Sequence, residues 1–251
     1  MIRLDRVSKS FGERHVLRDC SVEVAKGETL VVIGSSGTGK STLLRTIIGL
    51  ETPDDGQVLV DGQDVHELSE KGLRAMRARM GYLFQSGALI NWLTVGENVA
   101  LPLREGGRAP ADEIARRAER ALDMVGLAGT KDLMPGQLSG GMRKRAGLAR
   151  SIVTEPEIIL YDEPTTGLDP VTAHIIDRLI VDMKAKLGVT SVVVSHDMEG
   201  VYRVADRVAM LYDGRVIATG TPSEFRDAAD PIVRQFVHGA LEGPLGRENR
   251  P

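Results

Sequence analysis

The stretch from Gly34 to Thr42 has the residue types and the spacing of a phosphate-binding loop. It reads Gly-Ser-Ser-Gly-Thr-Gly-Lys-Ser-Thr, which fits the pattern G-x-x-x-x-G-K-[ST]. Glycines let the backbone bring its N–H groups onto phosphate oxygens. Lys40 adds a mobile charge for the outer phosphates, and the Ser41 hydroxyl can join the shell of a Mg²⁺ ion. The loop therefore predicts binding of a nucleoside triphosphate.

The residues on either side give this loop a strand before it and a helix after it. Thr29 to Ile33 is a short apolar, β-branched run that predicts a buried strand. Leu43 to Ile48 predicts a helix, whose positive dipole end would face the same anion. The alternative is a glycine-rich turn that binds nothing. Lysine and serine at the right offsets, between a strand and a helix, argue against it.

Composition limits the class of protein. The chain has 251 residues, 42% of them hydrophobic, which is enough for a core. Lys+Arg 32 against Asp+Glu 35 gives a net charge of -3, so we expect no nucleic-acid partner. Cys20 is the only cysteine, which fits a reducing compartment. No apolar run is long enough to span a membrane, and the first residues lack the apolar region of a signal peptide. These features predict a cytosolic protein or one on a cytosolic membrane face.

Three strand-like runs fill the first part of the chain. They are Ile2 to Val7, Val16 to Val24 and Thr29 to Ile33, separated by turns at Phe11-Gly12 and Lys26-Gly27. The two close turns predict antiparallel pairing. From the residues alone, Phe11 is interpreted as a partly exposed hydrophobe under a loop. The alternative is a stacking platform for an adenine ring.

A second helix begins at a Ser-Gly-Gly turn. Leu138-Ser139-Gly140-Gly141 leads into the helical pattern Ala146 to Val153. Such a turn at a helix N-terminus is a second anion site. One nucleotide has little use for two such sites in one chain. The pair therefore predicts that two copies of the chain share nucleotides.

An acidic pair follows an apolar strand. Glu157 to Tyr161 predicts the strand, and Asp162-Glu163 stands at its end. One carboxylate could hold Mg²⁺ and the next could polarise a water molecule. A solvated turn is the alternative, which the upstream phosphate loop disfavours.

The remaining pattern is again α/β. Asp169 as N-cap and Pro170 at the first helical position predict a long helix that Gly188 ends. Thr190 to Val194 predicts a buried strand, followed by Ser195-His196-Asp197. Further on, Arg207 to Tyr212 and Arg215 to Ala218 predict a hairpin across Asp213-Gly214.

The chain is expected to contain one α/β core with an insertion and a tail. Glu113 to Val125 is an amphipathic helical pattern, so we expect residues 91–153 to form an inserted helical subdomain. Residues 1–90 and 154–222 would form the core with a β subdomain. Residues 223–251 would form a partly helical tail.

The order of these motifs, from Ile2 to Pro222, resembles the ATP-binding subunits of ABC transporters. The most specific element is Leu138 to Gly141, which is similar to the signature loop of that family. The resemblance implies an α/β fold: a P-loop NTPase (RecA-like) core with an antiparallel β subdomain and an inserted helical subdomain. It also implies ATP hydrolysis coupled to transport.

The resemblance implies a role for each matching position. The nucleotide would be bound by Phe11, Ser35, Ser36, Gly37, Thr38, Gly39, Lys40, Ser41, Thr42 and Gln85, with Phe11 stacking on the adenine. Glu163 would be the general base, and His196 the switch histidine at the γ-phosphate. Ser41, Gln85 and Asp162 would hold Mg²⁺. The second subunit's nucleotide would meet Ser139, Gly140, Gly141 and Asp169.

Four positions depart from the family pattern. Most members have Gln where this chain has Met142, and often a second Gln where it has Lys144. The segment Thr166-Gly167-Leu168-Asp169 replaces the common Ser-Ala-Leu-Asp. Ser139 and both glycines remain, so we expect the anion site to survive.

Several stretches are similar to the ATPases of MCE-type (Mla-like) lipid transporters. They are Phe84 to Leu89, Leu93 to Val99, Leu138 to Arg145 and Asp230 to Gly239. This similarity implies a homodimer on the cytoplasmic face of the inner membrane that drives phospholipid movement. Its implied partners are a transmembrane permease, an MCE-domain lipid-binding protein and a small regulatory subunit.

Two other functions remain open. One is the ATPase of another importer, for amino acids or other small solutes. The other is a soluble ABC ATPase acting on DNA or ribosomes. The single cassette without a heptad run counts against the second.

Overall fold

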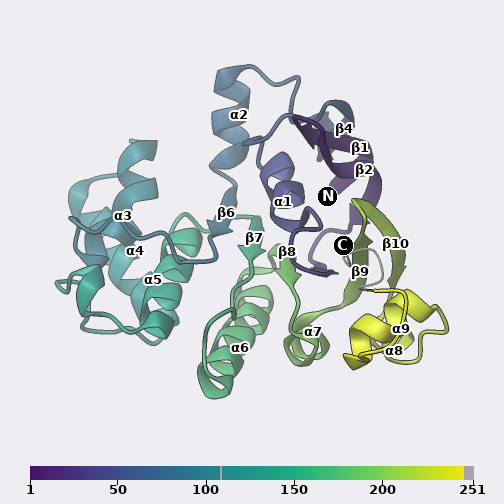
Figure 1. Ribbon diagram of the computed structural model, residues 1–251. Helices are drawn as coiled ribbons and strands as arrows, with labels where there is room; N and C mark the ends of the chain where they lie inside the picture. The colour runs from purple at the N-terminus through teal and green to yellow at the C-terminus, as the bar shows by residue number, and fades with distance from the viewer. Residues whose placement is uncertain (108, 246–251) are drawn as a thin grey trace. The chain divides into compact units, whose positions relative to one another are not determined.

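The computed structural model describes residues 1–107 and 109–245, and the chain divides into two compact units. The first unit comprises Met1–Glu67 and Val194–Pro251, and the second comprises Leu68–Val193. The boundary on the C-terminal side lies inside strand β8 (Thr190–Ser195). Within the described ranges, no helix combines the length and the apolar character needed to cross a bilayer. Figure 1 labels the elements.

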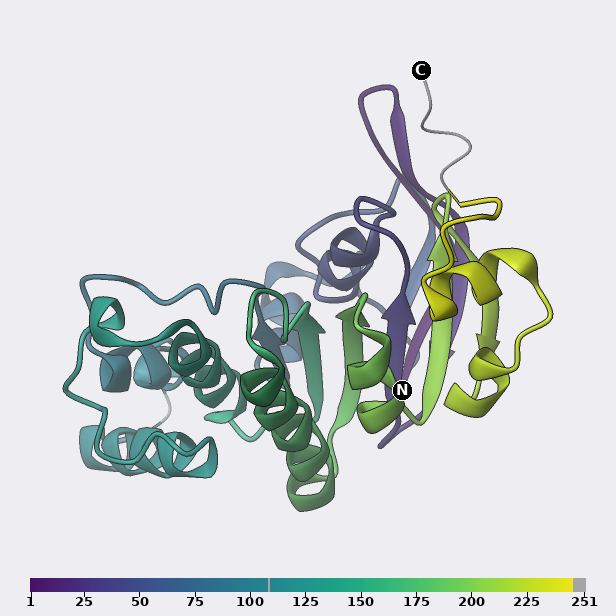
Figure 2. The same cartoon turned by 60° about the horizontal axis from the view of Figure 1, so that its bottom comes forward.

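The first unit contains an antiparallel sheet in the order β2-β1-β4-β5. Its strands are β1 (Ile2–Phe11), β2 (Arg14–Val24), β4 (Asp55–Val60) and β5 (Gln63–Asp64). The β1–β2 hairpin is long, and its turn projects in Figure 2. The antiparallel pairing that the first turn predicted is therefore confirmed.

The next strand belongs to a different sheet. β3 (Thr29–Ile33) runs parallel to β9 (Arg207–Tyr212), and β9 forms an antiparallel hairpin with β10 (Arg215–Gly220). The expected antiparallel pairing across Lys26-Gly27 is thus wrong. Every residue of β3 is buried, as in parallel strands that are covered on both faces, whereas β2 alternates between buried and exposed residues.

Helices complete the first unit. α1 (Lys40–Ile47) follows β3, and α7 (Met198–Val204) follows β8. In the tail, α8 (Pro222–Arg226) and α9 (Pro231–His238) lie side by side in both views, and α8 contacts β9 and β10. The buried amide of Gln235 donates to the carbonyl oxygens of Ala240 (3.1 Å) and Leu245 (3.2 Å). The tail therefore folds back on its own unit as far as Leu245.

The second unit is built on β6 (Met80–Leu83) and β7 (Ile158–Asp162), which are parallel, with β8 beyond β7. Its helices are α2 (Glu70–Arg77), α3 (Val95–Gly106), α4 (Ala111–Met124), the 3-10 turn Pro135–Gln137, α5 (Gly140–Ile152) and α6 (Pro170–Leu187). α3, α4 and α5 pack on one another, shown in teal in Figure 1. As predicted, Asp169 caps α6, Pro170 is its first residue and Gly188 ends it.

Helix α5 approaches neighbouring backbone closely. A Cβ atom at Gly147 would lie 2.9 Å from the carbonyl oxygen of Gly87, so only glycine fits there without a shift. Arg150 donates to the carbonyl oxygens of Gly87 (3.0 Å) and Ala88 (2.7 Å). α5 thus holds the turn that follows Gln85.

This contact predicts the effect of one methyl group. Gly147→Ala should lower the free energy of unfolding by about 1–3 kcal/mol, because the added carbon meets backbone atoms that cannot rotate away. Gly106→Ala is the control, since nothing lies within 4 Å of its added carbon. Urea unfolding of both variants gives the comparison, and equal stability of the two would contradict the close approach.

Candidate functional site

The glycine loop of the first unit encloses the Lys40 ammonium group. Lys40 is the first residue of α1 and is 4% exposed. Its Nζ donates to the carbonyl oxygens of Gly34 and Ser35, both at 2.8 Å. The Thr38 hydroxyl donates to the Ser35 carbonyl at 3.0 Å. The loop therefore fixes a positive charge beside the N-terminus of α1.

Two glycines of the loop are required by close backbone approach. Gly39 has φ 101°, and a Cβ there would lie 2.6 Å from the carbonyl oxygen of Val16. At Gly34 the Cβ would lie 2.3 Å from the carbonyl oxygen of Leu211. The loop is consequently held between β2 and β9. Any side chain at these positions would push the N-terminus of α1 out of place.

Phe11 and His196 are the other predicted site residues of the first unit. The Phe11 ring is 47% exposed, with the Lys9 Nζ 5.4 Å from its centroid. His196 is exposed directly after β8. Its neighbour Asp197 receives the Glu199 N–H (3.1 Å) and caps α7. Phe11 is thus about half exposed with the Lys9 ammonium over its ring, and His196 directly precedes the N-cap of α7.

In the second unit, three predicted site residues meet at the carboxyl ends of β6 and β7. The parallel register pairs Leu83 with Tyr161, so Gln85 and Glu163 each stand two residues beyond a paired position. The Gln85 Nε2 donates to the Glu163 Oε2 at 3.4 Å. Asp162, 5% exposed, accepts the Tyr82 hydroxyl at 3.2 Å. Ligand sites of parallel sheets form at this edge.

Glu163 has an unusual backbone conformation. Its φ of 47° lies in the left-handed region, which a non-glycine residue adopts only where its surroundings hold it. The Thr166 hydroxyl donates to the same Oε2 at 2.8 Å. The carboxylate is therefore fixed in direction, as a general base must be.

The Ser-Gly-Gly turn lies beside the start of α6. Ser139 caps α5, and its Oγ accepts the Met142 N–H at 3.2 Å. A Cβ at Gly141 would lie 2.4 Å from the Cγ2 of Thr172. Asp169 caps α6 and accepts the Thr172 hydroxyl at 2.6 Å, and these hydrogen bonds lower the pKa of Asp169. The second unit thus brings Ser139, Gly140 and Gly141 close to the Asp169 turn.

Charge separates two helix N-termini from the others. Among the α-helices in the described part of the chain, α1 and α5 alone begin without a carboxylate at the N-cap or in the first turn. Every other one has an acidic residue there: Glu70, Glu97, Asp112, Asp169, Asp197, Glu224 and Asp230. A carboxylate would occupy the positive dipole end. α1 and α5 therefore remain suited to an external anion.

The proposed metal ligands suit Mg²⁺ by their chemistry. Within the described ranges, no three or more His, Cys, Asp or Glu side chains form a cluster that could hold a metal ion. Mg²⁺ is usually held by one or two carboxylates with water and substrate phosphates. In the second unit, the Asp162 carboxylate and the Gln85 amide oxygen would supply hard oxygen ligands of the kind that Mg²⁺ prefers, and the Ser41 hydroxyl of the first unit is of the same chemical type.

The sequence patterns missed several residues that support the site. The sequence analysis assigns no role to Tyr82, whose hydroxyl donates to Asp162. Helix α3 was not delimited, although Thr94 and Glu97 form a capping box whose spacing would have located it. Lys144 was noted only as a departure from the family. It is buried, and burial lowers its pKa to about 8.

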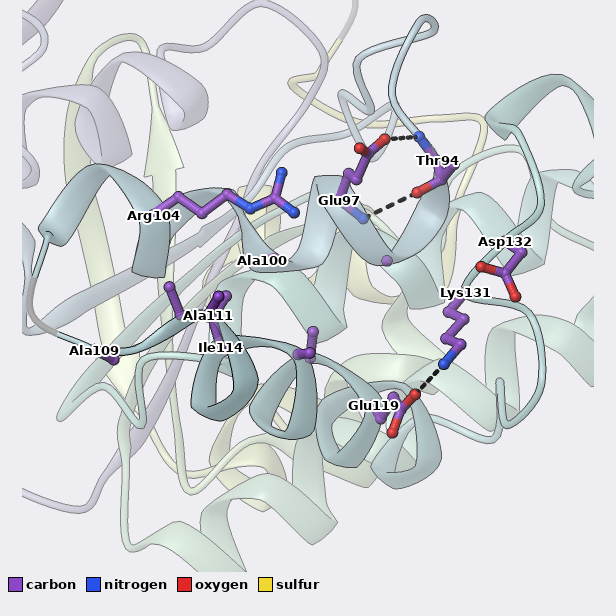
Figure 3. Close-up of a pocket in the computed structure, with 13 residues that line it drawn as sticks. Thr94, Glu97, Ala100, Arg104, Ala109, Ala111, Ile114, Glu119, Lys131 and Asp132 are labelled. Atoms are coloured by element: carbon purple, nitrogen blue, oxygen red, sulfur yellow. Dashed lines mark hydrogen bonds and ion pairs between the residues drawn. The ribbon is translucent and has the colours of Figure 1, made fainter.

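The second unit also contains a hollow between α3 and α4. Its volume is about 510 Å³, and Figure 3 shows Arg104 extending along α3 and the Lys131–Glu119 ion pair at the other end. Ala100, Ala111 and Ile114 line it. None of the proposed nucleotide-binding residues lines this hollow.

Three comparisons with known proteins agree on the family. The family model described as ABC transporter matches residues 17–166. The chain is 42% identical to the intermembrane phospholipid transport system ATP-binding protein MlaF of Escherichia coli K12, over 98% of this chain and 91% of that protein. It is 40% identical to mkl of Mycobacterium tuberculosis, named a probable ribonucleotide transport ATP-binding protein, over 98% of this chain and 68% of that protein.

Solved structures of similar fold indicate the same family. The ATP-binding cassette MJ0796, a dimer bound to ADP and Pi in a post-hydrolysis state, has a TM-score of 0.82 and 34% identity. The alignment covers 88% of this chain and 99% of that one. The expected P-loop core with an antiparallel β subdomain and a helical subdomain is thereby confirmed. The chain belongs to the ABC transporter family, as one of its ATP-hydrolysing subunits.

Proposed function

We propose that this ATPase powers phospholipid transport as a homodimer bound to a membrane permease. The observation that carries the proposal is the 42% identity to MlaF along nearly the whole chain. A second candidate is ribonucleotide transport, because mkl is 40% identical over the same 98% of the chain. An ATPase subunit supplies energy while its membrane partner contacts the cargo. The identity of that partner therefore distinguishes phospholipid transport from ribonucleotide transport.

The proposed mechanism assigns work to each part of the site. The loop Ser35 to Thr42 would bind the phosphates, with the Lys40 charge at their oxygens. Mg²⁺, held by Ser41, Gln85 and Asp162, would neutralise phosphate charge. Glu163 would take the proton of the attacking water, while His196 would contact the γ-phosphate. Ser139, Gly140, Gly141 and Asp169 would meet the nucleotide of the second subunit, with Phe11 on the adenine.

The proposal includes the domain division and the assembly. The ATPase domain would comprise residues 1–222, with a helical subdomain at 91–153 and a tail at 223–251. Beyond the permease, we propose an MCE-domain lipid-binding protein and a small regulatory subunit as partners. The complex would sit on the cytoplasmic face of the inner membrane. Dimers of a related cassette support the homodimer.

Replacing the base tests the chemistry. Glu163→Gln should keep ATP binding but lower turnover roughly 10²–10⁴-fold, because the amide cannot accept the proton of water. Glu155→Gln is the control, since Glu155 is an exposed glutamate of the same unit with a similar φ of 53°. Steady-state ATPase at saturating Mg·ATP is the measurement. Near-normal turnover of Glu163→Gln would contradict the assignment.

A groove in the second unit suits a segment of the permease. Its volume is about 1220 Å³, and it runs between α2, β6, α3 and α4. Met80, Tyr82 and Leu103 give it an apolar floor. Ion pairs such as Glu70–Arg74 (3.4 Å) and Glu113–Arg117 (2.6 Å) stand among its lining residues. An apolar floor with a charged rim fits a short amphipathic helix of a partner.

Blocking this groove tests the partner and the cargo. A polytopic membrane protein and phospholipid, identified by mass spectrometry, should co-purify with the wild-type protein from detergent-solubilised membranes. Ala75→Arg, on the exposed groove wall of α2, should lose both while the isolated subunit hydrolyses ATP normally.

Ala111→Arg serves as the control, because it fills the α3–α4 hollow of Figure 3 instead. Retention of the membrane protein by Ala75→Arg would reject the groove. Ribonucleotides bound to the membrane partner itself, rather than at the ATP site, would favour the second candidate.

A further inference from the structure

Lys144 is a buried cation on helix α5 that binds backbone rather than solvent. Its side chain is 6% exposed in relative terms. The Nζ donates to the carbonyl oxygen of Thr166 at 2.5 Å and to that of Glu163 at 3.3 Å. Both carbonyls belong to the turn that directly follows β7. Lys144 therefore joins α5 to the turn that carries the proposed base.

The turn that Lys144 contacts is closed on itself. The Thr166 N–H donates to the Glu163 carbonyl at 3.3 Å, and the Thr166 hydroxyl donates to the Glu163 carboxylate. Glu163 has a positive φ, so its conformation requires support from outside the residue. The Lys144 ammonium supplies such support at both ends of the turn. Its loss would free the backbone that sets the direction of the Glu163 side chain.

This arrangement has a cost in stability. Burial lowers the pKa of Lys144 to about 8, although the nearby Glu163 charge acts in the opposite direction. A buried ammonium thus disfavours the folded state at neutral pH. Groups that cost stability are often kept because function needs them. Contribution to folding alone is a poor explanation for Lys144.

The same helix presents Ser139. Lys144 lies about one and a half turns along α5 from its N-cap. Between them, Gly141 packs on Thr172 at the start of α6. Because a helix is stiff over this distance, any shift of its N-terminus on binding an anion would also shift the Lys144 contacts. The two ends of this path are a proposed nucleotide contact and the proposed base.

We propose that Lys144 is a positioning residue for ATP hydrolysis. Lys144 holds the Glu163 turn through hydrogen bonds to two backbone carbonyls and couples this turn to α5. The inference rests on the proposed role of Glu163. It adds a residue that touches neither nucleotide nor metal and acts through another side chain. It also provides a physical path by which the second subunit's nucleotide, bound at Ser139, would affect the position of Glu163.

Removing the ammonium group tests the proposal. Lys144→Met should lower kcat roughly 10- to 100-fold with little change in the KM for ATP, because the base is displaced while the phosphate loop is untouched. Lys144→Arg should recover most of the activity, since a guanidinium can donate to the same carbonyls. Lys144→Gln, which is shorter and neutral, should lose less than the methionine variant. If Lys144→Met fails to fold, the kcat of Lys144→Gln tests the proposal instead.

Arg145→Met is the matched control. Arg145 is the next residue on α5 and also donates to two carbonyl oxygens, those of Val125 (3.2 Å) and Gly126 (2.9 Å), away from the Glu163 turn. Its kcat should stay near that of the wild type. An equal loss of kcat in both methionine variants would overturn the proposal, because the loss would then not depend on contact with the Glu163 turn.

Stability provides a readout that a merely structural role would not give. At pH 7 the buried Lys144 amine is mostly protonated, so Lys144→Met should melt at the same temperature as the wild type or higher. Above pH 8 the wild type loses its buried charge, so its melting temperature should rise relative to that of the variant. A variant that melts lower than the wild type at pH 7, with kcat reduced in step, would overturn the proposal.

A double variant separates this inference from the role of Glu163. If Lys144 acts through that residue, Lys144→Met should cause no further loss of kcat in a Glu163→Gln background. A fully additive loss would overturn the positioning role and leave the base assignment intact. Near-normal kcat in Glu163→Gln alone would instead reject the base.

Discussion

An α-helix leaves the N–H groups of its first turn without helical partners, and this chain keeps two such N-termini for a negative group that it does not itself supply. α1 and α5 begin without an acidic residue at the N-cap or in the first turn, whereas the other described α-helices each have one there. Close packing holds both N-termini: Gly39 lies against the Val16 backbone and Gly141 against the Thr172 side chain. The rest of each unit depends on holding these helix ends in position.

Helix α5 connects more of the site than its sequence motif indicates. Its N-terminus carries Ser139, its middle carries Lys144 against the Glu163 turn, and Arg150 holds the turn after Gln85. These contacts lie in one unit and involve backbone carbonyls, so they transmit position rather than chemistry. A rigid helix with several such contacts is a direct way for a bound phosphate to affect the alignment of the base.

Local signals predicted much of the fold, and contacts between distant segments account for what was missed. Asp169 and Pro170 located the start of α6, because a cap and a fixed φ are local properties. The pairing of β3 was wrong, because which sheet a buried strand joins depends on distant partners such as β9. The roles of Tyr82 and Lys144 could not be predicted, because their partners Asp162 and Thr166 are brought near only by folding.

The central claim is that two copies of the chain complete each other's nucleotide sites. Mixing Ser139→Arg protein with Lys40→Ala protein, each inactive alone, tests it most directly. In a mixed dimer, the intact Lys40 of one copy meets the intact Ser139 of the other. ATPase activity should therefore appear on mixing, at up to about a quarter of the wild-type value if subunits pair at random. Normal hydrolysis by Ser139→Arg alone, or no activity in the mixture, would contradict the shared site.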